Sequence, residues 1–367
     1  MKFKNLRVFD TEELKICKSS DYNFIFNKKT GFFARWGKNP DDNPLYGPSC
    51  EILDIEISTI CSGSPTSGPC AHCYKSNTAA GKNMSFKTFK RVFDTINKEV
   101  PVLGQIAFGI GDIDSNPDLY EMFAYSRGNQ VIPNVTINGW RMNDYHFNML
   151  ARLCGAVAVS HYDDNHCFNA VKELTDRGKT QINIHKLLAK ETLHSCHQLI
   201  ESASVDSRLR KLNAIVFLLM KPKGSRNNLT PVKNLKDYRQ LFIHAKERGI
   251  AFGMDSCSGP NLLKATEGLD LFSTECVEPC ESTLFSLYIN VDGEVFPCSF
   301  TEGQPGWEEG IFILDKESFL KNVWYSDKIN EWRASLMCSS AYCNNCQFQK
   351  GCRSCPEYNI TICKEKR

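Results

Sequence analysis

The stretch EILDIEISTICSGSPTSGPCAHC, residues 51–73, decides the fold of this chain. Its first nine residues alternate apolar and polar side chains, as a half-buried β-strand does. Three cysteines, Cys61, Cys70 and Cys73, follow directly after this run. Thiolates are soft ligands that suit iron–sulfur clusters and zinc, so the stretch predicts a metal centre at the end of a strand. On these residues alone, a cluster and a zinc site are equally good interpretations.

Short β-rich runs alternate with longer amphipathic segments from residue 51 to about residue 260. The segment 85–100 has apolar residues at helical spacing, with Ser85 as its expected N-cap. Repeated strand–helix units predict parallel strands with right-handed crossovers. Six or seven such units predict a full or partial α/β barrel, and a doubly wound open sheet is the alternative. The later expected strands are 105–112, 131–139, 156–163, 181–189, 212–220 and 250–256, and the later helices are 116–128, 143–153, 167–178, 192–203 and 234–249.

The position of the first three cysteines favours a catalytic cluster over structural zinc. They follow the first strand of the array, and α/β barrels place their active sites at the carboxyl ends of the strands. Structural zinc is more typical of small domains or of domain margins.

A second group of cysteines fills the C-terminal part of the chain, where short segments and loops replace the alternation. It reads Cys280-x12-Gly293-x4-Cys298, then Cys343-x2-Cys346-x5-Cys352-x2-Cys355, then Cys363. A zinc ribbon would explain the paired cysteines, but it would explain neither the first motif nor Cys363. Residues 286–298 predict a β-hairpin that turns at Asp292–Gly293, and residues 319–336 predict one or two helices. Another hairpin is expected at 21–37.

Seven cysteines lie outside these two groups: Cys17, Cys50, Cys154, Cys167, Cys196, Cys257 and Cys338. We interpret them as buried or inert thiols, although Cys338 lies close to the second group and stays open as a ligand. Four residues near strand ends are interpreted as structural: Tyr74, Asp163, Asp255 and Cys257.

Composition points to an ordinary globular enzyme. The chain has 367 residues and a net charge of +2, which gives no general argument for binding nucleic acid or an anionic membrane. No apolar stretch approaches the roughly 20 residues that span a bilayer, and the first residues lack the apolar core of a signal peptide. We therefore expect a cytoplasmic protein, in which reduced cysteines act as metal ligands.

The loop after the first strand resembles that of the radical S-adenosylmethionine (radical SAM) superfamily. The resemblance implies that Cys61, Cys70 and Cys73 hold a 4Fe–4S cluster whose fourth iron binds the amino and carboxylate groups of SAM. The usual spacing in that family is Cys-x3-Cys-x2-Cys. Here it is Cys-x8-Cys-x2-Cys, because GSPTSGP (63–69) lengthens the loop.

The same resemblance suggests SAM contacts. His72 precedes the third cysteine, where the family packs a side chain near adenine; an ordinary loop histidine is the alternative. In IGDIDSNPDL (110–119), Gly111 and Asp112 take the places of the second glycine and the glutamate of the family's Gly-Gly-Glu-Pro motif. Asp112 would contact the SAM ammonium group, or else cap the next turn. Asn138 and Ser160, at the ends of later strands, would lie near SAM, Ser160 close to the ribose.

The second group of cysteines resembles the SPASM extension of radical SAM enzymes, which carries two auxiliary 4Fe–4S clusters. The segment VWYSDKINEWR (323–333) also resembles the helix that precedes its last cysteines. The last pair, Cys352-x2-Cys355, is one residue shorter than usual. Carried over by position, the first auxiliary cluster takes Cys276, Cys280, Cys298 and Cys355, with Cys338 as a substitute for Cys276, and the second takes Cys343, Cys346, Cys352 and Cys363.

The resemblance implies an N-terminal extension (1–50), a radical SAM partial (β/α)6 barrel (51–260) and a C-terminal cysteine-rich SPASM domain (261–367). It implies reductive cleavage of SAM to a 5′-deoxyadenosyl radical, with an external flavodoxin-like or ferredoxin-like electron donor. The expected substrate is a peptide or protein side chain, and the extension looks too short for a separate leader-binding domain. Radical oxidation of a small molecule such as a carbohydrate alcohol is one alternative. A zinc-stabilised or degenerate binding protein is the other.

Overall fold

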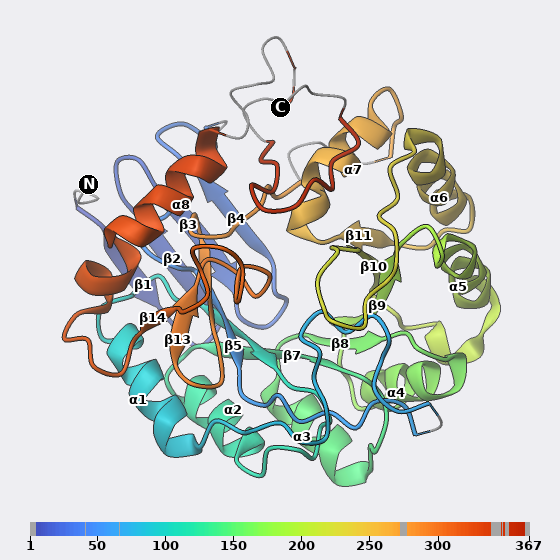
Figure 1. Ribbon diagram of the computed structural model, residues 1–367, viewed down its shortest axis with the longest axis horizontal. Coiled ribbons are helices and arrows are strands. Elements are labelled where there is room, and N and C mark those ends of the chain that lie inside the picture. The colour runs from blue at the N-terminus through green and yellow to red at the C-terminus, as the bar shows by residue number, and fades with distance from the viewer. Residues whose placement is uncertain are drawn as a thin grey trace.

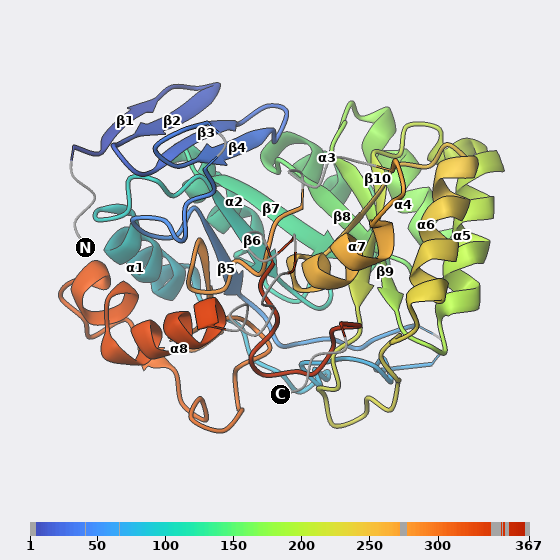
Figure 2. The same cartoon turned by 90° about the horizontal axis from the view of Figure 1, so that it is seen from above.

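The computed structural model describes residues 5–363 except 41, 66, 272–276, 339–345, 347 and 349–351. Its strands form two sheets, one of four strands near the N-terminus and one of ten strands. Figure 1 shows the ten-stranded sheet as a curved arc through the middle of the molecule, and Figure 2 shows the small sheet at one side of it. No helix in the described part of the chain has the length and apolar character needed to cross a bilayer.

Seven consecutive strands of the large sheet are parallel, and each lies beside the next one in the sequence. This order never reverses, so the doubly wound alternative is excluded and the partial barrel is confirmed. The seven strands are β5 (Ile52–Glu56), β6 (Gln105–Gly109), β7 (Ile132–Ile137), β8 (Val157–Ser160), β9 (Ile182–Leu188), β10 (Ala214–Leu219) and β11 (Phe252–Met254).

Six helices connect these strands and line the outer rim of the arc (Figure 1). The Ser85 hydroxyl caps the first of them, α1, by accepting a hydrogen bond from the backbone N–H of Thr88, as predicted. The apolar face of α1 packs on the sheet, where the ring centroids of Phe89 and Phe108 are 5.5 Å apart. The helices are α1 (Phe86–Asn97), α2 (Leu119–Gly128), α3 (Asp144–Leu153), α4 (Asp164–Asp176), α5 (Leu193–Val205) and α6 (Leu235–Glu247).

Strand β5 separates an apolar face from a polar one. Leu53 and Ile55 are fully buried, and Ile55 pairs with Phe108, which packs on α1. Since side chains alternate along a strand, Asp54 and Glu56 lie on the opposite face, inside the barrel. The first strand therefore carries two carboxylates into the interior.

Burial raises the pKa of Asp54 to about 6. The carboxyl of an unfolded aspartate ionises near pH 4, so the unfolded state loses its proton first as the pH rises. The free energy of unfolding should therefore fall between about pH 4 and about pH 6 and stay lower above that range. We expect Asp54→Asn to be more stable than the wild type by about 2 kcal/mol at pH 7.5, with a smaller difference at pH 5. Urea unfolding at several pH values measures this, and Asp114→Asn, at an exposed turn, is the control. A pH-independent difference would contradict the prediction.

The C-terminal part of the chain extends the same sheet. The predicted hairpin is confirmed as β12 (Ser286–Ile289) and β13 (Glu294–Phe296), with Gly293 in the turn at a φ of +85°. Strand β12 also pairs in parallel with β5, which the sequence analysis did not predict. The predicted boundary near residue 260 stays a prediction, since the sheet is continuous from the barrel into this part. The remaining elements are the 3-10 helices η1 (Ser207–Leu209) and η2 (Ser256–Ser258), α7 (Gly259–Thr266), β14 (Ile311–Phe312), the π-helix η4 (Leu320–Trp324) and α8 (Asp327–Cys338).

The N-terminal sheet contains the predicted hairpin as β3 (Asn23–Asn27) and β4 (Phe33–Trp36), preceded by two strands that were not predicted, β1 (Arg7–Asp10) and β2 (Leu14–Lys18). A buried ion pair attaches this sheet to the rest of the protein. Arg35 in β4 contacts both carboxylate oxygens of Glu51 at 2.7 and 2.9 Å, and it donates to Glu278 at 2.9 Å. The small sheet is thus joined to the start of β5 and to the segment before Cys280.

Candidate functional site

The three cysteines of the first loop lie together at the carboxyl end of β5. The thiols of Cys61, Cys70 and Cys73 are close enough for mutual electrostatic interaction. Two backbone hydrogen bonds shape the loop, from Cys73 N to the Cys70 carbonyl at 3.3 Å and from Cys61 N to the Thr78 carbonyl at 2.9 Å. Burial raises the pKa of Cys61 to about 11, so the thiol stays protonated until a metal displaces its proton.

The unusual length of the loop does not separate these cysteines. Ser64 and Gly68 exchange two backbone hydrogen bonds of 2.8 and 2.9 Å, so the insertion folds back on itself as a small turn. Gly63 and Gly68 both have positive φ values, which glycine adopts at low cost. Cys61 and Cys70 are thereby returned to the same place.

Gly111 and Asp112 lie directly against the loop, as the sequence analysis expected. A Cβ atom on Gly111 would be 2.4 Å from the Ile60 carbonyl oxygen and 2.5 Å from Cys61 Cβ, so only glycine fits here. The Asp112 side chain is almost fully buried and accepts a 2.8 Å hydrogen bond from the backbone N–H of Ser62. This carboxylate therefore holds the loop at the residue that follows Cys61.

Arg141 is a site residue that the sequence analysis missed. Its guanidinium group forms a 2.8 Å ion pair with Asp112 and donates to the Ser62 hydroxyl at 3.1 Å. Asn138, at the end of β7, donates to Asp112 at 3.3 Å. The only signal in the sequence was the position of Arg141, three residues after Asn138 in VTINGWR (135–141).

His72 stacks on another ring of the protein. Its ring lies 5.8 Å from that of Tyr162, which in turn stacks on Trp140 at 4.8 Å. The Tyr162 hydroxyl donates a hydrogen bond to the Cys70 sulfur, so this aromatic stack contacts the cysteine loop. Ser160 ends β8 two residues before Tyr162 and is half-buried.

The structure brings together several members of the second cysteine group. Cys280, Cys298 and Cys355 lie within electrostatic range as neighbours, Cys280 with Cys298 and Cys298 with Cys355. Cys346 and Cys363 both interact with the Lys264 ammonium group, and Cys352 is buried. The predicted ligands Cys276 and Cys343 lie outside the described residues. Among the residues described, no three His, Cys, Asp or Glu side chains converge tightly enough to hold a single metal ion.

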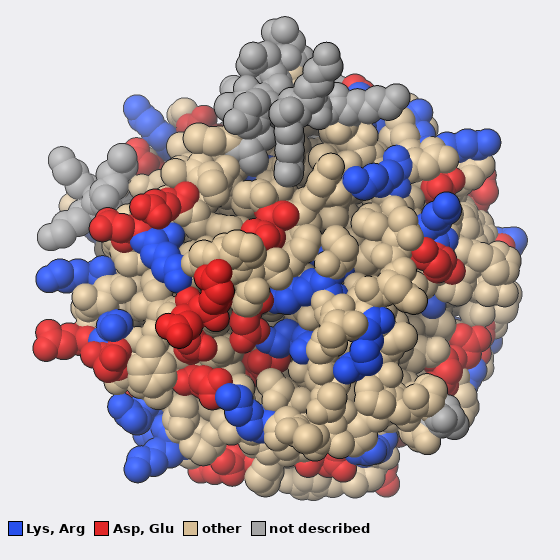
Figure 3. All heavy atoms as spheres, in the orientation of Figure 1, with Lys and Arg blue, Asp and Glu red and all other residues tan. Residues whose placement is uncertain are grey.

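A pocket of about 600 Å³ opens beside the first cysteine loop. Its walls are residues 74–78, which leave the loop, together with Glu56 of β5, Lys223 beyond β10 and Glu302 beyond the β12–β13 hairpin. On the face shown in Figure 3, acidic and basic side chains meet near the middle of the molecule. The pocket is thus polar and lies between the barrel and the C-terminal part.

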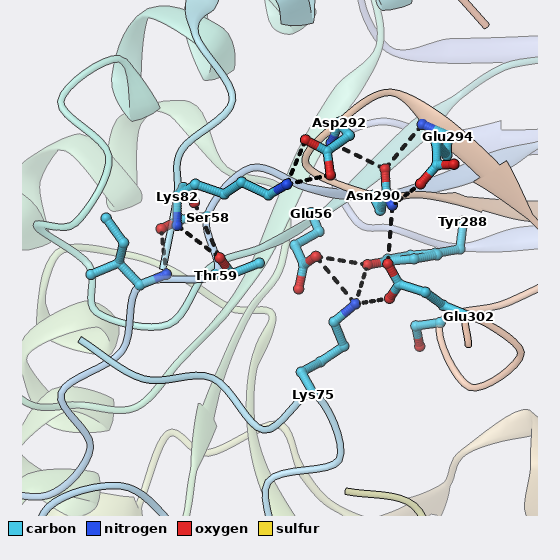
Figure 4. Close-up of polar contacts among 12 residues, drawn as sticks. Glu56, Ser58, Thr59, Lys75, Lys82, Tyr288, Asn290, Asp292, Glu294 and Glu302 are labelled. Carbon is cyan, nitrogen blue, oxygen red and sulfur yellow. Dashed lines mark hydrogen bonds and ion pairs between the residues drawn. The ribbon is translucent and has the colours of Figure 1, made fainter. Parts of the chain in front are cut away.

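Lys75 is the centre of the polar contacts in this pocket (Figure 4). Its ammonium group donates to the Tyr288 hydroxyl at 2.7 Å, forms an ion pair with Glu56 at 3.2 Å and also contacts Glu302. The Tyr288 hydroxyl donates to Glu56 at 2.9 Å. Desolvation is the main reason why the pKa of Glu56 is raised. Lys75 therefore links the first loop to β5 and to the hairpin that carries Cys298.

The fold and the two cysteine groups define a class of protein, a partial barrel with a cysteine loop followed by a cysteine-rich domain. Residues 280–356 match the SPASM family model, described as an iron–sulfur cluster-binding domain. No curated protein matches the chain in sequence.

Solved structures with this fold are similar over nearly the whole chain. Streptococcus suis SuiB bound to precursor peptide SuiA matches with a TM-score of 0.71 and 14% identity, over 98% of this chain and 100% of that one. SuiB bound to S-adenosylmethionine matches with a TM-score of 0.65 and 17% identity, over 86% and 77%. The AdoMet-bound enzyme anSMEcpe matches with a TM-score of 0.60 and 15% identity, over 85% and 93%. Together these matches confirm the predicted radical SAM fold with a C-terminal SPASM domain.

Proposed function

We propose that this protein is a radical SAM enzyme that modifies a side chain of a peptide or protein. Cys61, Cys70 and Cys73 would hold the SAM-binding 4Fe–4S cluster. The observation that carries this proposal is the fit of the first loop, where three thiols gather against Gly111 and no Cβ atom can enter. Three cysteines leave one iron of such a cluster without a protein ligand, and that iron would bind SAM.

Asp112 and Arg141 suit the amino-acid end of SAM. Their ion pair places an anion and a cation next to the cysteine loop, and the side chain of Arg141 remains 40% exposed. We propose that Asp112 receives the ammonium group of SAM and that Arg141 receives its carboxylate. Asn138 positions Asp112, while the stack of His72, Tyr162 and Trp140 and the nearby Ser160 would line the nucleoside end.

With the cluster and SAM bound, one electron from an external flavodoxin-like or ferredoxin-like donor cleaves SAM to methionine and a 5′-deoxyadenosyl radical, which abstracts hydrogen from the substrate. The protein contributes position and shelter. The stacked rings and the buried Asp112 exclude water from one side of the loop, and the barrel holds the substrate on the other. The SPASM cysteines would bind two auxiliary clusters. Cys346, Cys352 and Cys363, with Cys343, would hold the second.

A peptide is the substrate that the polar pocket suits best. The pocket offers charged side chains of both signs to backbone and side-chain groups, through Glu56, Glu302 and Lys223. Lys223 donates only to the carbonyl oxygens of Ser299 and Glu302 among the described residues, at 3.0 and 2.7 Å. The likeness to SuiB in complex with a precursor peptide supports this assignment.

The decisive experiment is the formation of 5′-deoxyadenosine by anaerobically reconstituted protein with SAM and dithionite. We expect the wild type to form it and the Cys61/Cys70/Cys73→Ala variant to form none, because that variant cannot bind the SAM cluster. The product is measured by chromatography with mass detection. Absence of the product from iron-replete wild type, with and without candidate peptides, would refute the proposal.

A further inference from the structure

Cys257 lies among the cysteines of the second group, although its place in the sequence gave no sign of this. Its thiol and that of Cys280 are hydrogen-bonded to each other. Cys298 and Cys355 are both close enough to Cys257 for electrostatic interaction. Four thiols from four separate segments of the chain therefore gather at one place.

The position of Cys257 is fixed independently of the other cysteines. It lies in η2, directly after β11, and the neighbouring Asp255 anchors this turn to β10. The Asp255 carboxylate accepts a 3.3 Å hydrogen bond from the backbone N–H of Leu219, and it also contacts Lys221 and the Ser258 hydroxyl. The barrel therefore presents this thiol to the C-terminal part as a fixed group.

Helix α7 brings the other segments to the same turn. A Cβ atom on Gly259, its first residue, would be 3.1 Å from the Glu278 carbonyl oxygen, so the chain just before Cys280 packs on the start of the helix. Asn261 donates to the Ile360 carbonyl at 3.0 Å and accepts from the Ile362 N–H at 2.8 Å. These bonds hold the last described segment of the chain, which contains Cys355.

The segments of Cys280 and Cys298 are tied to each other as well. The Ser282 hydroxyl donates to the Pro297 carbonyl at 2.9 Å, which links residues next to the two cysteines. The Tyr358 N–H donates to the Cys355 sulfur at 3.4 Å, a bond typical of the surroundings of cluster thiolates. The buried Lys221 lies close to both Cys257 and Cys355, where its positive charge would offset that of thiolate ligands.

We propose that Cys257 is the fourth ligand of the first auxiliary cluster, with Cys280, Cys298 and Cys355, in the place expected for Cys276. The inference rests on the proposed function only in that the chain must bind a cluster here. A multi-iron cluster holds its thiolates farther apart than a single ion does, which agrees with the lack of a tight three-residue site among the described residues. The interpretation of Cys257 as a structural thiol is then wrong.

Two matched variants test the assignment in the full chain, Cys257→Ala and Cys276→Ala, purified without oxygen beside the wild type. We expect Cys257→Ala to lose about one third of the bound iron and sulfide, the share of one cluster in three, and Cys276→Ala to lose none. Electron paramagnetic resonance of the reduced protein should lose one signal in the first variant only. The signal that changes on addition of SAM should remain in both. Wild-type iron content in Cys257→Ala would overturn the assignment.

A second measurement uses the wild type alone, so it does not depend on how a variant folds. Alkylation followed by peptide mapping should find Cys257 protected in the iron-loaded protein and modified after the iron is chelated under denaturing conditions. Cys276 should be modified in both. Modification of Cys257 in the iron-loaded protein would overturn the proposal. Failure to form 5′-deoxyadenosine would instead refute the proposed function and leave these two readouts unchanged.

Discussion

Replacing Gly111 with alanine is expected to abolish the SAM-dependent reaction while leaving the rest of the protein folded. The new Cβ atom would lie 2.4 Å from the Ile60 carbonyl oxygen and 2.5 Å from Cys61 Cβ. Neither neighbour is the end of a flexible side chain, so the loop must move, and Cys61 moves with it. A displacement of about 1 Å at a reacting centre costs roughly 100-fold in rate, and loss of the cluster would cost more. We therefore expect at least a 100-fold decrease in 5′-deoxyadenosine formation.

Gly128→Ala is the matched control for this prediction. Gly128 ends α2 and is exposed, and a Cβ atom added to it would have no heavy atom within 4 Å. In a helix, alanine is more favourable than glycine by about 1 kcal/mol, so this variant should keep full activity and its iron. Iron content and electron paramagnetic resonance should show that Gly111→Ala loses only the signal that responds to SAM. Full activity of Gly111→Ala would show that the loop does not hold the reacting centre.

Replacing Arg35 with methionine is expected to cause the largest loss of stability of any single change outside the cysteine groups. The side chains of Arg35 and Glu51 are 2% and 6% exposed, and their contact is bidentate. Methionine keeps much of the side-chain length but leaves Glu51 as an unpaired buried charge beside Glu278. Breaking a buried ion pair from one side costs about 3 to 5 kcal/mol. The free energy of unfolding in urea at neutral pH measures the loss.

Lys29→Met provides the comparison, since Lys29 forms an ion pair with Glu13 at the surface, where the two side chains are 67% and 56% exposed. Pairs of this kind contribute at most about 1 kcal/mol. We also expect Arg35→Lys to be intermediate, because it keeps the charge but loses the two-pronged contact. Equal losses in Arg35→Met and Lys29→Met would show that the N-terminal sheet contributes little to the stability of the barrel.

The barrel strands and helices could be predicted because their signals are local. Alternation at 51–58 and helical spacing at 85–100 each reflect a single element packing against the core. Strands β1 and β2 were missed because charged residues interrupt them, yet Lys15 in β2 is buried and donates to the Leu103 carbonyl at 2.6 Å. A lysine that finds a buried carbonyl looks like a surface residue in the sequence.

The candidate site was predicted where a motif has fixed spacing and missed where distant segments meet. Gly111 and Asp112 follow a strand at a recognisable position, so they could be placed beside the cysteine loop. Arg141 reaches Asp112 from another strand end, and Cys257 reaches Cys280 from across α7. Neither contact leaves any pattern in the sequence, because each depends on how non-adjacent segments pack.

The pairing of β12 with β5 also bears on how the chain can be divided. A barrel cut free near residue 260 would expose the backbone N–H and C=O groups of β5 as an open edge, in register for pairing from residue 52 to residue 55. Exposed edges of this kind recruit strands from other molecules and promote aggregation. The C-terminal part thus shields the first strand of the barrel, and the two parts are best expressed and engineered as one unit.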